Sequence, residues 1–165
     1  MAFKIRSICS SDYDSIIAVI DAWWGGRPMA GMLPRLFFKH FQETSFIADV
    51  EGKTAGFLVG FLSPSYPEEA YIRFAGVHPD YRQAGIGRAL YKRFVEVVCK
   101  KNRKVVRCVT SPANVNSIAF HRQVGFEIEA SKNQAGDIHV HTDYDGPGED
   151  RVLFKMELDS TEHRP

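Results

Sequence analysis

The feature that most constrains this chain is the stretch of residues 77–91, where an apolar strand pattern passes through a proline turn and a glycine-rich loop into a helix pattern. Its sequence is Val-His-Pro-Asp-Tyr-Arg-Gln-Ala-Gly-Ile-Gly-Arg-Ala-Leu-Tyr. Gly85 and Gly87 let the backbone approach a ligand closely. The first turn of a helix leaves amide N–H groups unpaired beside the positive end of the helix dipole. The stretch therefore predicts a cradle for an anion such as a pyrophosphate.

Two other glycine-rich phosphate loops do not fit the pattern Arg82-x-x-Gly85-x-Gly87. The stretch lacks the Gly-x-x-x-x-Gly-Lys-Ser/Thr of a P-loop. It also lacks the third glycine and the early position in the chain that are typical of a dinucleotide-binding fold. The pattern therefore argues against nucleotide hydrolysis and hydride transfer.

The same pattern resembles the Arg/Gln-x-x-Gly-x-Gly/Ala signature of the GCN5-related N-acetyltransferases, the GNAT superfamily, in which this loop holds the pyrophosphate of acetyl-coenzyme A. A second segment, residues 114–126, reads Asn-Val-Asn-Ser-Ile-Ala-Phe-His-Arg-Gln-Val-Gly-Phe. It resembles the next landmark of that family, a helix that begins Asn-x-x-Ala/Ser and closes on Gly-Phe. The two landmarks together, in this order, are more specific than either alone, and the resemblance covers essentially the whole chain.

Hydrophobic patterning predicts the element order β-α-α-β-β-β-α-β-α-β-β. The expected strands are 3–8, 45–50, 54–62, 70–77, 104–109, 126–129 and 152–158, and the expected helices run from about 11 to 23, from 34 to 43, from the glycine loop to about 100, and from 114 to 124. The third helix carries apolar residues at intervals of four, namely Ile86, Leu90, Phe94 and Val98. The resemblance implies an α/β (α+β) GNAT fold, a mixed central β-sheet splayed at the acetyl-CoA site with helices on both faces.

The length of the chain predicts a single domain, which by the resemblance is an acetyltransferase domain over residues 1–158, followed by a flexible tail over 159–165. The chain has 21 Lys+Arg against 20 Asp+Glu, a net charge of +1, so no strong field favours nucleic acid or an anionic membrane as a partner. We find no apolar run near the ~20 residues of a membrane span and no signal-peptide pattern, which predicts a cytoplasmic protein. The oligomeric state stays open, a homodimer included.

Neither the cysteines nor the histidines predict a metal cofactor. Cys9, Cys99 and Cys108 are odd in number and widely spaced, without a Cys-x-x-Cys pair, so we expect free thiols that fill the core rather than a nucleophile. His139 and His141 share a strand-like face with a nearby aspartate, but no fourth ligand is in view. We expect acetyl-CoA as co-substrate and no metal.

The resemblance assigns two sets of residues to acetyl-CoA. The backbone of Gly76 and Val77 would bond the pantetheine arm, with the Val77 amide beside the thioester carbonyl. On the helix of residues 114–124, Asn114, Ser117 and His121 fall on one face and would line one side of the co-substrate. The loop would hold the pyrophosphate through backbone amides more than through arginine side chains, over Arg82, Gln83, Ala84, Gly85, Ile86, Gly87 and Arg88.

Acetyl transfer to an amine requires a neutral amine, stabilisation of charge on the thioester oxygen and protonation of the leaving thiolate. His121 stands where the family usually has a proton-donating tyrosine, and its unperturbed pKa of ~6.5 suits that task. The alternative is a histidine that contacts the pantetheine without moving a proton.

The general base is less defined. Tyr71 aligns with the position of the catalytic glutamate in several relatives, and Glu69 shares its strand face. Glu69 would serve as the base or lie at the surface as a strand-end acid, in which case the proton leaves through water. Arg73, on the same face, would pair with Glu69 or with a carboxylate of the acceptor.

The sequence thus predicts an N-acetyltransferase that moves an acetyl group from acetyl-CoA to a primary amine, by direct transfer in a ternary complex. Acceptor specificity would lie in residues 23–33 and 131–151, and their bulk favours a closed pocket for a small molecule. Trp23 and Trp24 would wall that pocket or serve as core and rim residues. Two alternatives stay open: a protein N-terminal or lysine acetyltransferase, and a CoA-binding module without catalysis.

Overall fold

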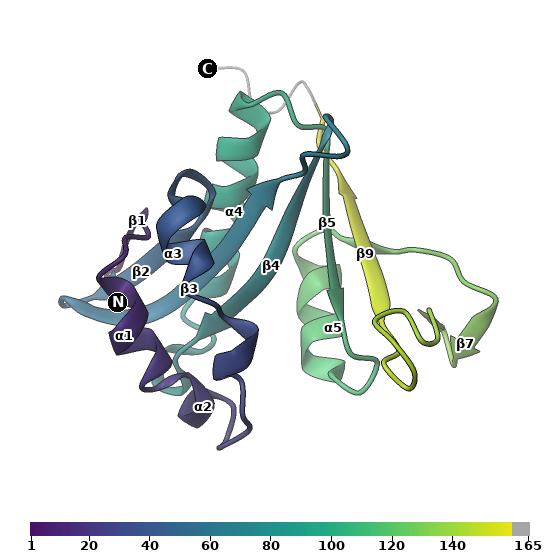
Figure 1. Ribbon diagram of the computed structural model, residues 1–165, viewed down its shortest axis with the longest axis horizontal. Coiled ribbons are helices and arrows are strands. Elements are labelled where there is room, and N and C mark those ends of the chain that lie inside the picture. The colour runs from purple at the N-terminus through teal and green to yellow at the C-terminus, as the bar shows by residue number, and fades with distance from the viewer. Residues whose placement is uncertain (160–165) are drawn as a thin grey trace.

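The computed structural model describes residues 1–159, and it shows a seven-stranded mixed sheet with helices on both faces (Figure 1). The strand order is β1-β2-β3-β4-β5-β9-β6, and β7 with β8 forms a separate hairpin. The strands are β1 (Lys4–Ser7), β2 (Phe46–Val50), β3 (Lys53–Leu62), β4 (Glu69–Val77), β5 (Val105–Thr110), β6 (Glu127–Ile128), β7 (Asn133–Ala135), β8 (Ile138–Val140) and β9 (Val152–Glu157). The helices are α1 (Asp12–Ile17), α2 (Ile20–Trp23), α3 (Leu36–His40), α4 (Ile86–Lys100) and α5 (Val115–Gln123), with 3-10 turns η1 (Ala30–Met32), η2 (Gln42–Thr44) and η3 (Pro79–Tyr81). Apart from Asp159, the predicted tail lies outside the described residues.

Two buried clusters hold the sheet between its helices. The predicted stripe of α4 is buried and packs on one face together with Leu58 of β3. Phe57 and Val59, the neighbours of Leu58, point to the other face and pack with α1, α2 and α3. Because successive side chains of a strand alternate between faces, β3 contributes to both clusters. The mixed sheet with helices on both faces confirms the predicted fold.

The sheet opens between β4 and β5. These parallel strands pair only over three residues of β4, Glu69 to Tyr71, and then diverge, as the V between them in Figure 1 shows. The pairing of β3 with β4 also shifts register, from Val59 opposite Phe74 to Gly60 opposite Ile72. Arg73 is the extra residue at this bulge, and a bulge bends its strand. The predicted splay of the sheet is confirmed.

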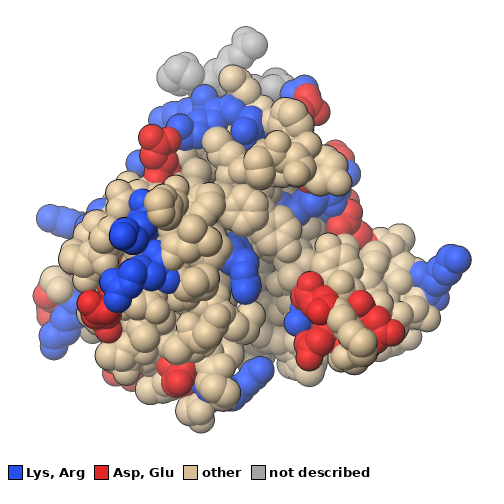
Figure 2. All heavy atoms as spheres, in the orientation of Figure 1, with Lys and Arg blue, Asp and Glu red and all other residues tan. Residues whose placement is uncertain are grey.

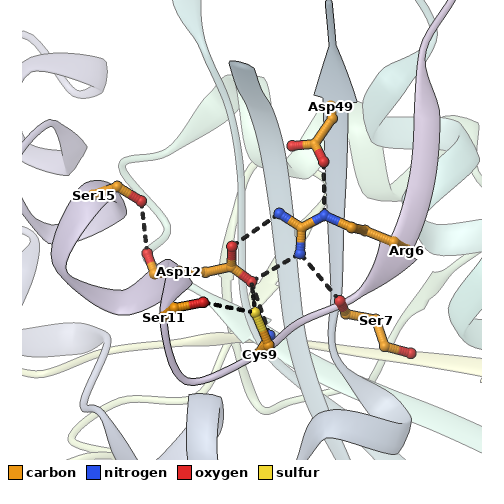
Figure 3. A network of polar contacts seen from close by, with 7 residues as sticks. All are labelled: Arg6, Ser7, Cys9, Ser11, Asp12, Ser15 and Asp49. Carbon is orange, nitrogen blue, oxygen red and sulfur yellow. Dashed lines mark hydrogen bonds and ion pairs between the residues drawn. The ribbon is translucent and has the colours of Figure 1, made fainter. Parts of the chain in front are cut away.

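The network around Arg6 ties β1 to α1 and β2 (Figure 3). Arg6 Nε donates to Asp49 Oδ2 at 2.7 Å, and its two Nη atoms donate to the Asp12 carboxylate at 2.8 and 2.9 Å. The Cys9 amide also donates to Asp12, at 2.8 Å. Burial by itself raises the pKa of Asp12, but the hydrogen bonds from Arg6 and Cys9 outweigh it and hold that pKa below its usual value. Asp12 therefore serves as an ionised link between the first strand and the first helix.

Some local predictions were wrong. The helix expected over residues 11–23 is two short helices with a break after Ile17, and the loop expected over residues 131–151 contains the hairpin β7–β8. Of the three cysteines, all free thiols, only Cys108 is buried, so the expectation of core filler fails for Cys9 and Cys99. Within residues 1–159, no helix combines the length and apolar character needed to cross a membrane.

Candidate active site

A cavity of about 1180 Å³ occupies the opening between β4 and β5, and Figure 2 shows the surface hollowed there. The diverging strands form its floor, and α5 lines one side. Trp23, Trp24 and Met29 form what we call the apolar wall. Residues Asp145, Glu149 and Arg151, which follow the hairpin β7–β8, form the charged wall. The cavity is larger than the ~300–1000 Å³ of a typical small-ligand site, so it has room for two substrates together.

The glycine loop ends in a helix start without a capping side chain. Gly85 is the N-cap of α4 with φ 82°, and within the described part of the chain no side chain caps the first turn. Gln83 also has a positive φ, 66°, which is uncommon for a residue with a Cβ atom. The amides of the first turn and the dipole of this 15-residue helix therefore favour an anion at this end. Gly87 lines the cavity, and a Cβ placed on it would lie 3.3 Å from the Phe120 ring.

Arg82 connects two elements of the cavity. Its Nη2 donates to the Trp23 carbonyl at the end of α2, and its Nε donates to the Val77 carbonyl at 3.3 Å. The side chain therefore anchors the apolar wall to the end of β4. Two carbonyl oxygens of the protein thus engage the Arg82 guanidinium, and the role of the loop amides as phosphate ligands stays a prediction.

Gly76 lets the apolar wall lie against β4. A Cβ on Gly76 would overlap the Trp24 ring and lie 2.9 Å from Phe57. Trp23 is buried in the core, whereas Trp24 is only partly buried, and both line the cavity. Both predicted roles of the tryptophan pair therefore apply: Trp23 is a core residue and Trp24 is a wall residue.

The predicted face of α5 lines the cavity with Asn114, Ser117 and His121. Asn114 is the N-cap of α5, and its Oδ1 accepts from the Ser117 amide at 3.1 Å. This cap uses Asn114 in the structure of the helix itself. Asn114, Ser117 and His121 thus lie on the cavity side of α5, and their contact with the co-substrate stays a prediction.

His121 is 6% exposed, and both of its ring nitrogens have partners. Nδ1 lies 2.7 Å from the Ser117 carbonyl oxygen, which can only accept, so Nδ1 carries a proton. Nε2 lies 2.9 Å from the hydroxyl of Tyr91, and the ring stacks on Phe154 with centroids 4.6 Å apart. Burial lowers the pKa of His121, partly opposed by the bond to Ser117. The favoured form is thus a neutral imidazole that accepts from Tyr91.

Tyr91 is a site residue that sequence reasoning did not identify. It lies on α4 beside the apolar stripe and lines the cavity, and burial raises its pKa well above the usual value. Its hydroxyl therefore stays protonated and donates to His121. In the sequence, the only signal for this contact was a tyrosine beside the apolar stripe of the helix.

Of the two residues predicted as candidates for the general base, Glu69 and Tyr71, only Tyr71 lines the cavity. Glu69 lies at the closed end of the opening, where its Oε2 accepts from Arg107 Nε at 3.0 Å, and it does not line the cavity. The expected pair between Arg73 and Glu69 is therefore wrong, because Arg107 takes that position. Tyr71 lines the cavity and stacks on Phe61, and its pKa is raised to about 12, chiefly by burial. Tyr71 thus stays a neutral hydroxyl at physiological pH.

His139, one of the histidines considered as a metal ligand, has contacts within its own hairpin segment. His139 Nδ1 lies 3.0 Å from both the amide nitrogen and the carbonyl oxygen of Ser131. Among residues 1–159, no group of three or more histidine, cysteine or acidic side chains is arranged to hold a metal ion.

Comparison with known proteins places these features in a family. Residues 13–126 match the acetyltransferase (GNAT) family. The chain is 30% identical over 89 residues to the L-2,4-diaminobutyric acid acetyltransferase of Nocardia farcinica, covering 54% of this chain and 46% of the relative. It is 26% identical over 137 residues to an uncharacterized N-acetyltransferase of Methanocaldococcus jannaschii, covering 76% of this chain and 61% of the relative. The chain thus spans about half to three fifths of these two relatives.

Solved structures share the fold. Ard1 from Thermoplasma volcanium superposes with a TM-score of 0.77 at 21% identity, over 97% of this chain and 100% of that one. The diaminobutyrate acetyltransferase of Paenibacillus lautus, in complex with L-2,4-diaminobutyric acid and coenzyme A, superposes with a TM-score of 0.69 at 21% identity, over 94% and 95%. Together with the match over residues 13–126, the splayed sheet and its glycine loop show that the chain belongs to the acetyltransferase (GNAT) family.

Proposed function

We propose that this protein transfers an acetyl group from acetyl-CoA to a primary amine of a small molecule, directly within a ternary complex. The observation that carries the proposal is the cavity between β4 and β5, which meets the uncapped start of α4. An extended pantetheine arm fits an opening between two strands whose facing edges have lost their partners. Solved structures of the same fold, at 17–21% identity, contain coenzyme A or acetyl-CoA, which supports acetyl-CoA as the co-substrate.

Three groups of residues bind different parts of acetyl-CoA. The amides of the loop from Arg82 to Arg88, with Gly87 leaving space for close approach, hold the pyrophosphate. Gly76 and Val77 bond the arm, and the face of α5 that carries Asn114 and Ser117 covers it. The amine then attacks the thioester carbon, the C–S bond breaks, and the thiolate takes a proton while the amine loses one.

Proton transfer is constrained by the contacts of His121. A neutral His121 carries its proton on Nδ1, toward Ser117, so donation to the thiolate needs a second proton on Nε2. Burial disfavours that charged form. Donation by His121 stays a prediction, and its alternative is an imidazole that orients Tyr91 beside the thioester. With Tyr71 neutral and Glu69 held by Arg107, we propose that the amine loses its proton to water.

The acceptor is a small amine because two walls bound the cavity. The apolar wall closes one side and the charged wall the other, whereas a peptide substrate needs an open groove. Similarity to L-2,4-diaminobutyric acid acetyltransferases supports that diamino acid as the first acceptor to test.

The test combines turnover with binding. Release of free thiol from acetyl-CoA is measured with L-2,4-diaminobutyrate, polyamines, aminoglycosides and peptides, and acetyl-CoA affinity is measured by calorimetry for wild type and Gly87→Val. We expect thiol release with a small amine and weaker acetyl-CoA binding in the variant. Tight binding of CoA without release for any amine would identify a non-catalytic module. Wild-type affinity in a folded Gly87→Val would refute the placement of the pyrophosphate.

A further inference from the structure

The cavity carries opposite charges on two sides of one tyrosine. Arg73 and Tyr71 come from β4, and Asp145 and Glu149 come from the charged wall, and all four line the cavity. The pKa of Tyr71 responds to charges from both sides, because Asp145 raises it and Arg73 lowers it. The charges of Arg73 and Asp145 therefore both act near Tyr71, on the floor of the cavity.

Arg73 presents an uncompensated positive charge. It is the extra residue at the β4 bulge and its side chain is exposed in the cavity. The acid nearest to it along the strand face, Glu69, is held by Arg107 at 3.0 Å. No acidic side chain among residues 1–159 lies within ion-pair distance of Arg73. Its guanidinium is therefore available to a ligand.

The charged wall has an excess of one negative charge. Arg151 Nε lies 2.7 Å from Asp145 Oδ2, and Arg151 Nη2 lies 3.0 Å from Glu149 Oε2, so two carboxylates share one guanidinium. The side chains of Asp145 and Glu149 are 47% and 59% exposed, which leaves oxygens open to a further cation. Figure 2 shows acidic side chains gathered beside the hollow, at the lower right.

The segment that carries these acids is fixed by its own hydrogen bonds. The Asp145 amide donates to the Glu149 carbonyl at 3.1 Å, and the Gly148 amide donates to Asp143 Oδ1 at 2.7 Å. The Asp143 amide donates in turn to Asp150 Oδ1 at 2.9 Å. The backbone that carries the Asp145 and Glu149 carboxylates is thus held in place before any ligand binds.

We propose that the acceptor is a small diamino acid, whose carboxylate binds Arg73 and whose non-reacting ammonium binds Asp145 and Glu149. The inference rests on the proposed acetyl transfer and deepens it. A guanidinium forms paired hydrogen bonds with a carboxylate, whereas an ammonium group is attracted to the acids as a point charge. The reacting amine has to be neutral, so it is the other amine of the acceptor that stays charged beside the acids.

The experiment pairs two acceptors with two variants. L-2,4-diaminobutyrate and 1,3-diaminopropane differ only in the carboxylate, and each is assayed with wild type, Arg73→Gln and Arg93→Gln. Arg93 is the control because it lies on α4, outside the cavity, beside Glu96. We expect Arg73→Gln to raise KM for the diamino acid about 10-fold or more, the worth of a charged hydrogen bond, and to leave KM for the diamine within about 2-fold.

A second pair of acceptors tests the proposed ammonium site at Asp145 and Glu149. 4-Aminobutyrate lacks the α-amine of L-2,4-diaminobutyrate but keeps the carboxylate. We expect Asp145→Asn to raise KM for the diamino acid several-fold and to leave KM for 4-aminobutyrate nearly unchanged. The Arg93→Gln protein should match wild type with every acceptor.

The outcomes separate the two proposals. Equal losses with both acceptors in Arg73→Gln, or no loss with either, would overturn the carboxylate site while acetyl transfer stands. If wild type acetylates no amine, calorimetry of L-2,4-diaminobutyrate with the CoA-loaded protein still tests the site, since Arg73→Gln has to weaken that binding and Arg73→Lys has to restore part of it. Absence of binding in the wild type would refute the inference.

Discussion

The apolar wall of the cavity belongs to a buried cluster, whereas the charged wall lies at the surface and is held by ion pairs and backbone turns. Trp23 and Met29 are 3% and 9% exposed, and the Asp21 carboxylate accepts from the Met29 and Ala30 amides at 2.7 and 2.9 Å. The charged wall has no comparable burial. We infer from this difference that the apolar wall is part of the fold, whereas the charged wall can change its side chains, and hence its acceptor, without unfolding the protein.

His121 lies on α5, which lines one side of the cavity between the two walls, and its replacement should have the largest effect. If it protonates the thiolate, His121→Phe lowers kcat about 100-fold with little change in acetyl-CoA affinity, and His121→Tyr recovers part of the rate. Because burial lowers the pKa of His121, the charged donor is lost as pH rises through a value below ~6.5. Wild-type kcat should then fall with rising pH in that range, and His121→Phe should lack this limb.

The result that excludes donation is equally specific. Rates for His121→Phe within a few-fold of wild type, with the same pH profile, would show that water or another group protonates the thiolate and that His121 moves no proton. Tyr91→Phe then becomes the matched variant, because it removes only the hydroxyl that donates to Nε2.

Gly76→Ala tests whether the apolar wall is part of the fold. The added methyl group overlaps the Trp24 ring, so we expect a loss of about 1–3 kcal/mol in the free energy of unfolding. Urea unfolding followed by tryptophan fluorescence measures it, since both tryptophans of the chain lie in this wall. Gly31→Ala is the control, because a Cβ there meets nothing within 4 Å. Equal stabilities of the two variants would contradict this account of the wall.

Asp12→Asn tests the ionised link between Arg6 of β1 and Asp12 of α1. Losing a charged hydrogen-bond partner should cost about 1.5–3 kcal/mol in unfolding free energy near neutral pH. The pKa of Asp12 is lowered in the folded protein, so its contribution is present above ~pH 4 and is lost as pH falls through the lower folded value. Stability curves of wild type and Asp12→Asn should therefore converge in acid, and parallel curves would count against the ionised link.

Glu149→Gln, in the charged wall, should have the smallest effect on stability. Its ion pair with Arg151 is 59% exposed on the acidic side, and exposed pairs contribute about 0–1 kcal/mol. We expect a change within about 0.5 kcal/mol by urea unfolding, together with a weaker affinity for the acceptor. A loss as large as that of Gly76→Ala would show that this wall, too, is part of the fold.

The sequence predicted those features that depend on local spacing. The stripe of α4, the shared face of Asn114 and His121, and the glycine loop follow from periodicity and turn chemistry. The hairpin β7–β8 was missed because its strands are only three residues long and β7 is exposed throughout, although Gly136-Asp137 between them is a recognised hairpin signal.

Contacts between distant segments could not be predicted. Glu69 pairs with Arg107 instead of Arg73 because β5 lies beside the start of β4, which no local pattern reveals. The hydroxyl of Tyr91 meets His121 only after α4 and α5 pack on the same face. Both contacts decide the chemistry of the site, and both depend on tertiary packing.

The divergence of β4 from β5 also bears on how the protein behaves at high concentration. Past Tyr71, two facing strand edges lack strand partners, and such edges invite the addition of a foreign strand. Here they face each other across a cavity walled on both sides, which restricts entry to a single narrow chain. A ligand that fills the opening occupies both edges at once and also stabilises the folded state. We therefore expect coenzyme A to protect the protein from aggregation, so that solutions saturated with coenzyme A remain clear at temperatures where the free protein precipitates.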